Sequence, residues 1–394
     1  MLHGLKRWIL MMNKAQYLRL PRKHSLDFYA YIIGLIVFTG IAFLEVWPAL
    51  AGPAGISGAV VAGVWALVPV IFTLLLVWII DYWEPEPLWL YALAFAWGGG
   101  VSVLVGALIN DFASSRLIPK LLDEGATVYD ISRYTASWIA PISEEAVKGA
   151  GIILIYVAFR HYFNGPVDGI VYGALIGAGF SFTENILYFV RNFDFLTEVF
   201  TVRFLDGPLS HDTYSALFGF FIGFAEYSRH KWAIVWWTIP AMLSAGTFHF
   251  INNDALNWEG MTYETYKVIS NVPLAVVASA MVIYARSYEK KAVLGGLERY
   301  VREGWFARYE VTMIARMRYR QQALLWAERQ ARKLGAPPGK GTEAMRRFQD
   351  IMLQVGHETT RAQRSGKHVA LSDQTYLQEL LLKAQTLRSV FTTG

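Results

Sequence analysis

Apolar stretches long enough to cross a bilayer recur along most of the chain. A crossing takes about 20 consecutive, mainly apolar residues in a helix. Polar or turn-forming segments such as 81–87 and 252–257 separate eight such stretches. They are residues 27–48, 58–80, 88–109, 134–159, 168–190, 206–227, 232–252 and 268–286. The pattern predicts an all-α, polytopic membrane bundle of about eight spans.

The chain after residue 286 has a different pattern, in which polar helices carry a few apolar positions. Turn-forming residues at 335–339 and near 365–366 divide it, so two or three helices are expected. We therefore divide the chain into an N-terminal segment (1–26), a membrane core (27–286) and a small helical tail (287–394). The tail has enough apolar residues to form a small bundle or to bind a cytoplasmic partner.

Charge is concentrated at the two ends of the chain. Residues 1–26 contain six Lys and Arg and no acidic residue, and residues 287–394 contain 19 basic and 10 acidic residues. Because an excess of Lys and Arg marks the cytoplasmic side, both termini are expected there, with an even number of spans between them. The basic residues between 316 and 333 fit either contact with anionic headgroups or a solvated helix face.

The composition excludes several functional classes. A hydrophobic content of 54% with 15% aromatics argues against disorder and against nucleic-acid binding. The chain has no cysteine, which removes disulfides, thiolate zinc ligands and a cysteine nucleophile. A metal site in this chain must therefore use nitrogen and oxygen ligands.

Ionisable side chains interrupt the apolar pattern of four predicted spans. In 134–159, Glu144 and Glu145 both lie one helical turn from Lys148, so one carboxylate can be paired while the other stays available. In 168–190, Glu184 follows glycines that permit close approach of a neighbouring helix. His211 and His249 lie in the next two spans, and Asn253 follows one turn after His249.

Glu144, Glu184, His211 and His249 are all predicted to lie in the outer half of the bilayer. With both termini inside and a rise of about 1.5 Å per residue, Glu144 lies roughly 15 Å from the outer end of its helix, and Glu184 roughly 9 Å. His211 and His249 lie within roughly 8 Å of that end. A buried charge at the membrane centre costs about 3 kcal/mol or more. The shared depth therefore favours one site over scattered packing residues.

Glutamate and histidine side chains supply an N/O ligand set suited to zinc, and a further carboxylate can deprotonate a water molecule. Asn253 is a candidate for stabilising an oxyanion. The same residues can also activate water without a metal, so the pattern leaves both mechanisms open. Two other classes also stay open, a proton- or cation-coupled transporter or channel and a non-catalytic scaffold that works through the tail.

The order of these motifs resembles the PrsW family of intramembrane proteases, which is related to the CAAX prenyl endopeptidases and to the Abi (bacteriocin-immunity-type) membrane proteins. The resemblance covers about residues 134–254. It rests on Glu144, Glu145 and Lys148, on Phe180, Glu184 and Asn185, on Arg203 and His211, and on His249 and Asn253.

The resemblance implies an endopeptidase in a bacterial cytoplasmic membrane that cleaves a membrane-anchored protein such as an anti-sigma factor. It implies that Glu144 and Glu145 activate the water, with Glu144 as the base, and that Asn253 stabilises the oxyanion. Glu184, His211 and His249 would then be the ligands of a zinc ion. Compared with the CAAX-type pattern, Lys148 replaces an arginine and Glu184 replaces a histidine.

Overall fold

The structure of the chain is a computed structural model that describes residues 26–50, 54–228, 230, 232–365 and 371–392. Across these residues every regular element is a helix, which confirms the predicted all-α class. The basic segment predicted at 1–26 lies outside the described residues, apart from Leu26. The helices form two compact units. The first contains the described residues up to Ala225 together with Ile234–Ile283, and the second contains Glu226–Ala233 and the residues from Tyr284 onward.

Six helices in the described part of the chain are long and apolar enough to cross a membrane. They are α2 (Leu26–Leu50), α3 (Gly55–Ile80), the continuous helix of α4 (Leu88–Ala96), η1 (Trp97–Ser102) and α5 (Val103–Asp123), α8 (Pro166–Arg191), α11 (Ala233–Asp254) with η7 (Ala255–Asn257), and α12 (Tyr263–Arg302). The protein is thus a polytopic membrane protein.

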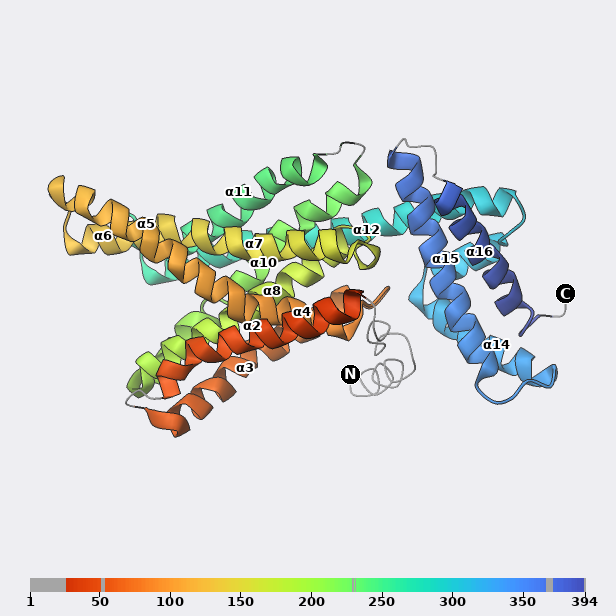
Figure 1. The fold of residues 1–394 in the computed structure, drawn as a ribbon, viewed down its shortest axis with the longest axis horizontal. Helices are drawn as coiled ribbons and strands as arrows, with labels where there is room; N and C mark the ends of the chain where they lie inside the picture. The colour runs from red at the N-terminus through yellow and green to blue at the C-terminus, as the bar shows by residue number, and fades with distance from the viewer. Residues whose placement is uncertain (1–25, 51–53, 229, 231, 366–370, 393–394) are drawn as a thin grey trace. The chain divides into compact units, whose positions relative to one another are not determined.

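The two remaining predicted spans are also helical. The first comprises α6 (Val128–Tyr134), η2 (Thr135–Ile139) and α7 (Ala140–Ala158), and the second centres on α10 (Ser210–Gly223). By composition α7 is too polar to count among the candidate spans, since it carries three charged side chains. By length α10 is too short, since it has 14 residues. Their crossing of the membrane stays a prediction. Both pack beside α8 in the middle of the first unit (Figure 1).

Short helices complete the first unit and join its longer ones. They are η3 (Arg160–Tyr162), η4 (Phe193–Phe195), α9 (Leu196–Phe200) and η5 (Thr201–Leu205). A further short helix, η6 (Phe224–Tyr227), continues α10, and its last two residues belong to the second unit.

Two helices run well past the apolar stretches that predicted them. The helix that starts at Leu88 has 36 residues and ends at Asp123, where the prediction ended at residue 109. The last span, predicted for 268–286, belongs to the 40-residue helix α12. A 36-residue helix is about 54 Å long, and the hydrocarbon core is about 30 Å thick. Hydropathy marks only the part of a helix that matches the bilayer, so it misses polar continuations.

Glycines on one side of α8 allow α10 to pack against its backbone. A Cβ atom added at Gly173 would overlap the carbonyl oxygen of Ser215, and one at Gly177 would lie 2.5 Å from the Cα of Asp212 and from the carbonyl oxygen of His211. On another side of α8, a Cβ at Gly179 would overlap the carbonyl oxygen of Phe95. These contacts confirm the close approach that the glycine pattern predicts.

The connection between α3 and α4 buries acidic groups that a polar loop usually exposes. Asp81 accepts hydrogen bonds from the Tyr91 hydroxyl and from the backbone N–H of Glu86, the latter at 3.0 Å. Glu86 accepts one from the Tyr172 hydroxyl at 3.1 Å. Burial raises the pKa of both carboxyl groups well above the usual range, as does repulsion from Asp168. The loop is therefore a packed part of the fold.

The second unit contains four helices beyond α12, so the predicted count of two or three is wrong. They are α13 (Arg308–Ile314), α14 (Met317–Lys333), α15 (Lys340–Ser365) and α16 (Leu371–Arg388). The break predicted at 335–339 is confirmed, since Gly335 and Gly339 adopt φ values of 82° and 86° there. At the second predicted break, α15 ends at Ser365, and residues 366–370 lie outside the described part.

The second unit also includes the segment that follows α10. Glu226 is buried there and forms an ion pair with Arg361 of α15, while the Tyr227 ring packs 5.3 Å from that of Tyr288 on α12. The helices α12 and α15 are in direct contact: the Thr360 hydroxyl donates a hydrogen bond to the carbonyl oxygen of Ala292 at 2.6 Å. The tail thus packs around the segment that joins α10 to α11.

Candidate active site

The two adjacent carboxylates of α7 have different surroundings. Lys148 is fully buried, and its Nζ lies 2.5 Å from Oε1 of Glu145 but 3.8 Å from Oε2 of Glu144. Oε2 of Glu144 is buried and makes no hydrogen bond with any residue that the structure describes. One carboxylate of the pair is therefore neutralised and the other is available, as the helical spacing predicts.

His249 on α11 is held on two sides. Its Nδ1 lies 3.0 Å from Oε1 of Glu145, the carboxylate that also binds Lys148. The ring stacks on Tyr214 of α10, with centroids 5.1 Å apart and planes inclined by 20°. Its other nitrogen, Nε2, faces Glu144 at 3.9 Å from Oε2. The ring therefore directs Nε2 toward the carboxylate of Glu144.

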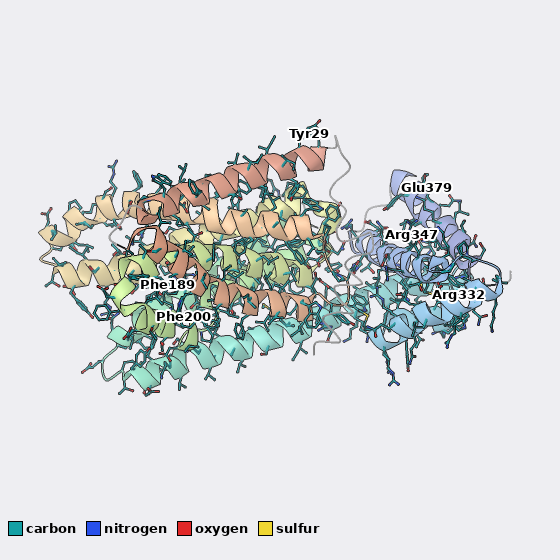
Figure 2. The ribbon with its side chains drawn as sticks, turned by 90° about the horizontal axis from the view of Figure 1, so that it is seen from below. Tyr29, Phe189, Phe200, Arg332, Arg347 and Glu379 are labelled. Carbon is teal, nitrogen blue, oxygen red and sulfur yellow. The ribbon has the colours of Figure 1, made fainter. Side chains whose placement is uncertain are left out.

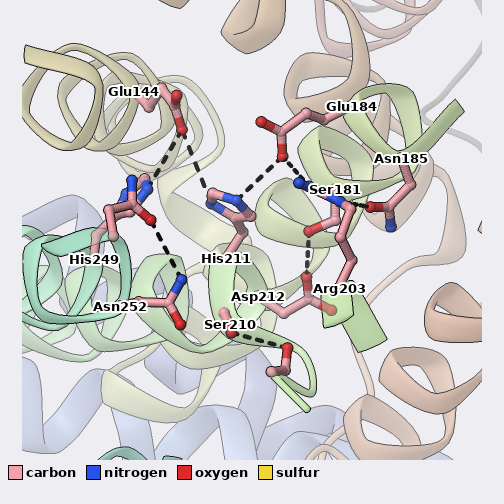
Figure 3. A network of polar contacts seen from close by, with 12 residues as sticks. Glu144, Ser181, Glu184, Asn185, Arg203, Ser210, His211, Asp212, His249 and Asn252 are labelled. Carbon is pink, nitrogen blue, oxygen red and sulfur yellow. Dashed lines mark hydrogen bonds and ion pairs between the residues drawn. The ribbon is translucent and has the colours of Figure 1, made fainter. Parts of the chain in front are cut away.

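His211 on α10 has a similar arrangement built from other helices (Figure 3). Its Nε2 lies 3.2 Å from Oε2 of Glu184, and Arg203 of η5 forms an ion pair with the same oxygen. The Nε–H of Arg203 also donates to the Asn185 side chain at 2.5 Å. The Nδ1 of His211 lies 4.0 Å from Oε2 of Glu144 and accepts from Lys148 at 3.1 Å.

The two histidines thus share a pattern of cation, carboxylate and imidazole. On one side, Lys148 forms an ion pair with Glu145, and Glu145 contacts a ring nitrogen of His249. On the other, Arg203 forms an ion pair with Glu184, and Glu184 contacts a ring nitrogen of His211. A carboxylate bonded to one ring nitrogen fixes the tautomer and orientation of a histidine and raises the basicity of the other nitrogen. Glu145 and Glu184 are therefore placed to orient the histidines, while Glu144 lies between the two rings.

Glu144, His211 and His249 form a group that can hold a metal ion. One ligand atom from each lies within 4.8 Å of the others. Ligands of tetrahedral zinc at about 2.0–2.1 Å lie about 3.3 Å from one another, so a small contraction suffices. The sequence placed Glu184 in the ligand set and Glu144 outside it. In the structure Glu184 contacts Arg203 and His211, while Glu144 lies in the group with the two histidines. Which of the two glutamates binds the metal and which acts as the base stays a prediction.

Asn253 lies one turn after His249 at the edge of this group. Its amide donates a hydrogen bond to the carbonyl oxygen of Ala136 in η2 at 2.9 Å, and Asn252 donates to its side-chain oxygen at 3.3 Å. A carboxamide has two N–H donors, so one stays available for an oxyanion. The role predicted for Asn253 stays a prediction.

Sequence reasoning assigned no role to several side chains that hold the site together. Asp212 accepts from Ser181 at 3.1 Å and from Thr73, which ties α10 to α8 and α3. Asp254 pairs with Arg133 at 2.7 Å and joins the end of α11 to α6. Partners that lie on different helices leave no periodic signal in a sequence. For Asp212 the adjacent His211 was the only available indication.

The turn before α10 has an unusual backbone. Leu209 adopts φ 54°, in the left-handed region that costs a side chain such as leucine roughly 1 kcal/mol. The next residue, Ser210, begins α10 and donates to the carbonyl oxygen of Gly207 at 3.0 Å. This turn ends two residues before His211 and so sets where the imidazole enters the site.

Replacing Gly177 with alanine is expected to displace His211. The added methyl group would lie 2.5 Å from backbone atoms of α10, so that helix must move away from α8. We expect a loss of about 1–3 kcal/mol of stability, seen as a lower unfolding temperature in detergent, together with reduced activity. Gly246→Ala is the matched control, because no atom lies within 4 Å of a Cβ at that position one turn before His249. Equal behaviour of the two variants would contradict this account.

Comparison with known proteins points to the same family as the order of the sequence motifs. The family model described as PrsW family intramembrane metalloprotease matches residues 86–283, which is half of the chain and contains every residue of the site. No solved structure matches the chain.

Three curated relatives, each called Protease PrsW, match shorter parts of the chain. The protein of Bacillus subtilis is 34% identical over 119 residues, which is 29% of this chain and 52% of that relative. Those of Geobacillus kaustophilus and Halalkalibacterium halodurans are 36% and 33% identical over 23% of this chain, and 39% and 43% of their own lengths are covered. The chain thus spans about half, or less, of the relatives it matches. With the family model covering the site and half of the sequence, the chain belongs to the PrsW family of intramembrane metalloproteases.

Proposed function

We propose that this protein is an intramembrane endopeptidase that hydrolyses a peptide bond of a membrane-anchored protein. The observation that carries the proposal is the Glu144 carboxylate, whose buried Oε2 makes no hydrogen bond and lies between two imidazoles that other charged groups orient. Burial of a carboxylate in a membrane bundle is costly, and its place between two oriented imidazoles is typical of a site that does chemistry. Membership of the family supports the same activity.

The residues present fit a zinc ion. His211 and His249 supply two imidazoles, and one glutamate, Glu184 or Glu144, completes a set that zinc peptidases use. Glu145 supports His249 through its Nδ1. Coordination through Nδ1 of His211 requires Lys148 to give up its hydrogen bond to that nitrogen, while its ion pair with Glu145 can stay. A bound zinc ion would supply Lewis acidity and a water of lowered pKa.

The protein's own groups account for the proton transfers. When Glu184 completes the ligand set, Glu144 is free to act as the base. It accepts a proton from the attacking water as the water oxygen bonds to the carbonyl carbon. The same proton then passes to the leaving nitrogen as the C–N bond breaks. Glu145 and Lys148 keep His249 in one orientation, and Arg203 and Glu184 do the same for His211. The free N–H of Asn253 donates to the developing oxyanion.

The site's place within the bundle supports a membrane-anchored substrate. A site inside a membrane bundle meets peptide bonds of proteins that are themselves anchored in the bilayer, and an anti-sigma factor is one such protein. We place the protein in a bacterial cytoplasmic membrane with both termini in the cytoplasm, on the basis of the basic ends. In that orientation the site lies toward the outer face.

The activity can be tested without knowing the substrate. The full chain is produced in a bacterial host, and new N-termini of membrane proteins are quantified by mass spectrometry. Wild type is expected to generate N-termini that are absent with Glu144→Gln. Glu45→Gln is the matched control, since Glu45 is a carboxylate of α2 that belongs to none of the contacts described above. Its pattern should equal that of wild type.

Measurements on the same membranes distinguish the protease from a transporter and from a scaffold. If wild type and Glu144→Gln give the same N-termini while ion flux into vesicles differs, the site serves transport and the protease assignment is wrong. If neither readout changes but deletion of residues 287–394 removes the cellular phenotype, the protein acts as a scaffold through its tail.

A further inference from the structure

One exposed side of α14 in the second unit combines positive charge with the exposed side chain of Leu325 and the partly exposed ring of Trp326, which packs 5.9 Å from the ring of Phe391. Leu325 is 56% exposed and Trp326 is 39% exposed, although both are large and apolar. Residues three, four or seven positions apart share one side of a helix, and the exposed basic residues of α14 recur at such intervals around Leu325. We call this surface the α14 basic face. It comprises Arg318, Leu325, Trp326, Arg329, Arg332 and Lys333.

Most of the charge on this face is uncompensated. The single acidic residue of α14, Glu328, accepts from the backbone N–H of Gly339 at 2.7 Å and pairs with Arg332 at 3.0 Å. Arg318, Arg329 and Lys333 form no ion pair with any residue in the described part of the chain. Three positive charges are therefore available to a negatively charged surface.

The opposite side of α14 is fixed in the core of the second unit. Ala327 and Ala331 are fully buried, and the buried Arg320 exchanges hydrogen bonds with Gln349 of α15 at 3.0 and 3.3 Å. The basic face is thus the outer surface of a packed helix. Figure 2 shows where Arg332 lies on α14.

We propose that the α14 basic face docks on the anionic headgroups of the membrane that holds the protein. Clustered Lys and Arg on a helix next to a span are attracted to anionic lipid, and exposed leucine and tryptophan insert at the boundary between headgroups and acyl chains. The tail is also tethered to that membrane, because α12 is a candidate span and ends at Arg302, shortly before α14 begins at Met317. Tethering makes the bilayer the partner with the highest effective concentration.

The absence of cysteine makes this face directly measurable. A single cysteine in place of the exposed Gln322, between Arg318 and Trp326, carries an environment-sensitive fluorophore in the full-length protein. The protein is reconstituted in vesicles of phosphatidylcholine alone or mixed with phosphatidylglycerol, and lipids with nitroxide chains act as quenchers. Strong quenching is expected only in the anionic vesicles. Glu379→Cys, on the exposed surface of α16, is the control and should show the same weak quenching in both.

Charge removal tests the cause of the docking. Combining Arg318→Gln, Arg329→Gln and Lys333→Gln is expected to weaken docking about 5-fold per charge, or about 100-fold in total. Salt at 1 M should act in the same direction, since the Debye length falls from about 10 Å at 0.1 M to about 3 Å. Glutamine is a good helix former, so the unfolding temperature of the triple variant should match that of wild type.

The proposal is overturned by equal quenching in neutral and anionic vesicles, or by quenching that the triple variant retains. Absence of quenching in every vesicle also overturns it, and an acidic soluble protein would then be the partner to test. None of these outcomes depends on the intramembrane site.

Discussion

A Glu144→Gln variant is expected to cleave its substrate about 10²- to 10⁴-fold more slowly than wild type, without losing stability. Glutamine keeps the shape of the side chain but cannot accept the proton of the attacking water. Because Oε2 of Glu144 is buried without a hydrogen bond and its cation, Lys148, is 3.8 Å away, its replacement by a neutral amide removes a weakly compensated charge. The unfolding temperature in detergent should therefore stay the same or rise.

Replacing the adjacent Glu145 should instead lower the stability of the protein. In Glu145→Gln the buried ammonium of Lys148 loses its partner at 2.5 Å, and removing one member of a buried ion pair costs about 3–5 kcal/mol. This variant is expected to unfold at a lower temperature and to misplace His249. Cleavage rates on a substrate found by the N-terminus comparison, measured beside unfolding temperatures, separate the two effects. A Glu144→Gln variant with more than about a tenth of the wild-type rate would show that Glu144 is not the base.

Purified protein is expected to contain one zinc ion per chain, and His249→Ala is expected to lose it. Glu184→Gln distinguishes the two ligand sets. If Glu184 only orients His211, zinc affinity should fall about 10- to 100-fold and metal should be restored at higher concentration. If Glu184 is itself a ligand, the variant should lose zinc as completely as His249→Ala does.

Elemental analysis and titration against a competing chelator provide the measurement, and neither depends on activity. Glu45→Gln should retain a full complement of metal. Wild-type protein that contains no metal and cleaves normally after chelation would contradict the zinc assignment. Glu144 would then act on water directly, and the peptidase assignment would be unaffected.

The sequence predicted much of the architecture because membrane insertion leaves a strong signal. Each span needs a long apolar stretch, and the stretches at 27–48, 58–80 and 168–190 match described helices closely. The same signal failed at the ends of α5 and α12, where the helix continues past the length that the bilayer requires. It also failed in the tail, whose short amphipathic helices have polar breaks that hydropathy does not resolve.

The sequence by itself also predicted that Glu144, Glu145, Glu184, His211 and His249 form one group, since these side chains are costly to bury in a membrane. In the structure they lie in one network of contacts. Local spacing on α7 further predicted that Lys148 pairs with one carboxylate and leaves the other free. What only the tertiary structure decided is the partner of each group, because the partners come from different helices. His249 and Glu145 are 104 positions apart, and the pairing of Glu184 with Arg203 depends on how η5 packs beside α8. Helical periodicity relates residues within one helix, whereas charge neutralisation across helices depends on packing, and that packing leaves Oε2 of Glu144 between the two imidazoles without a hydrogen bond.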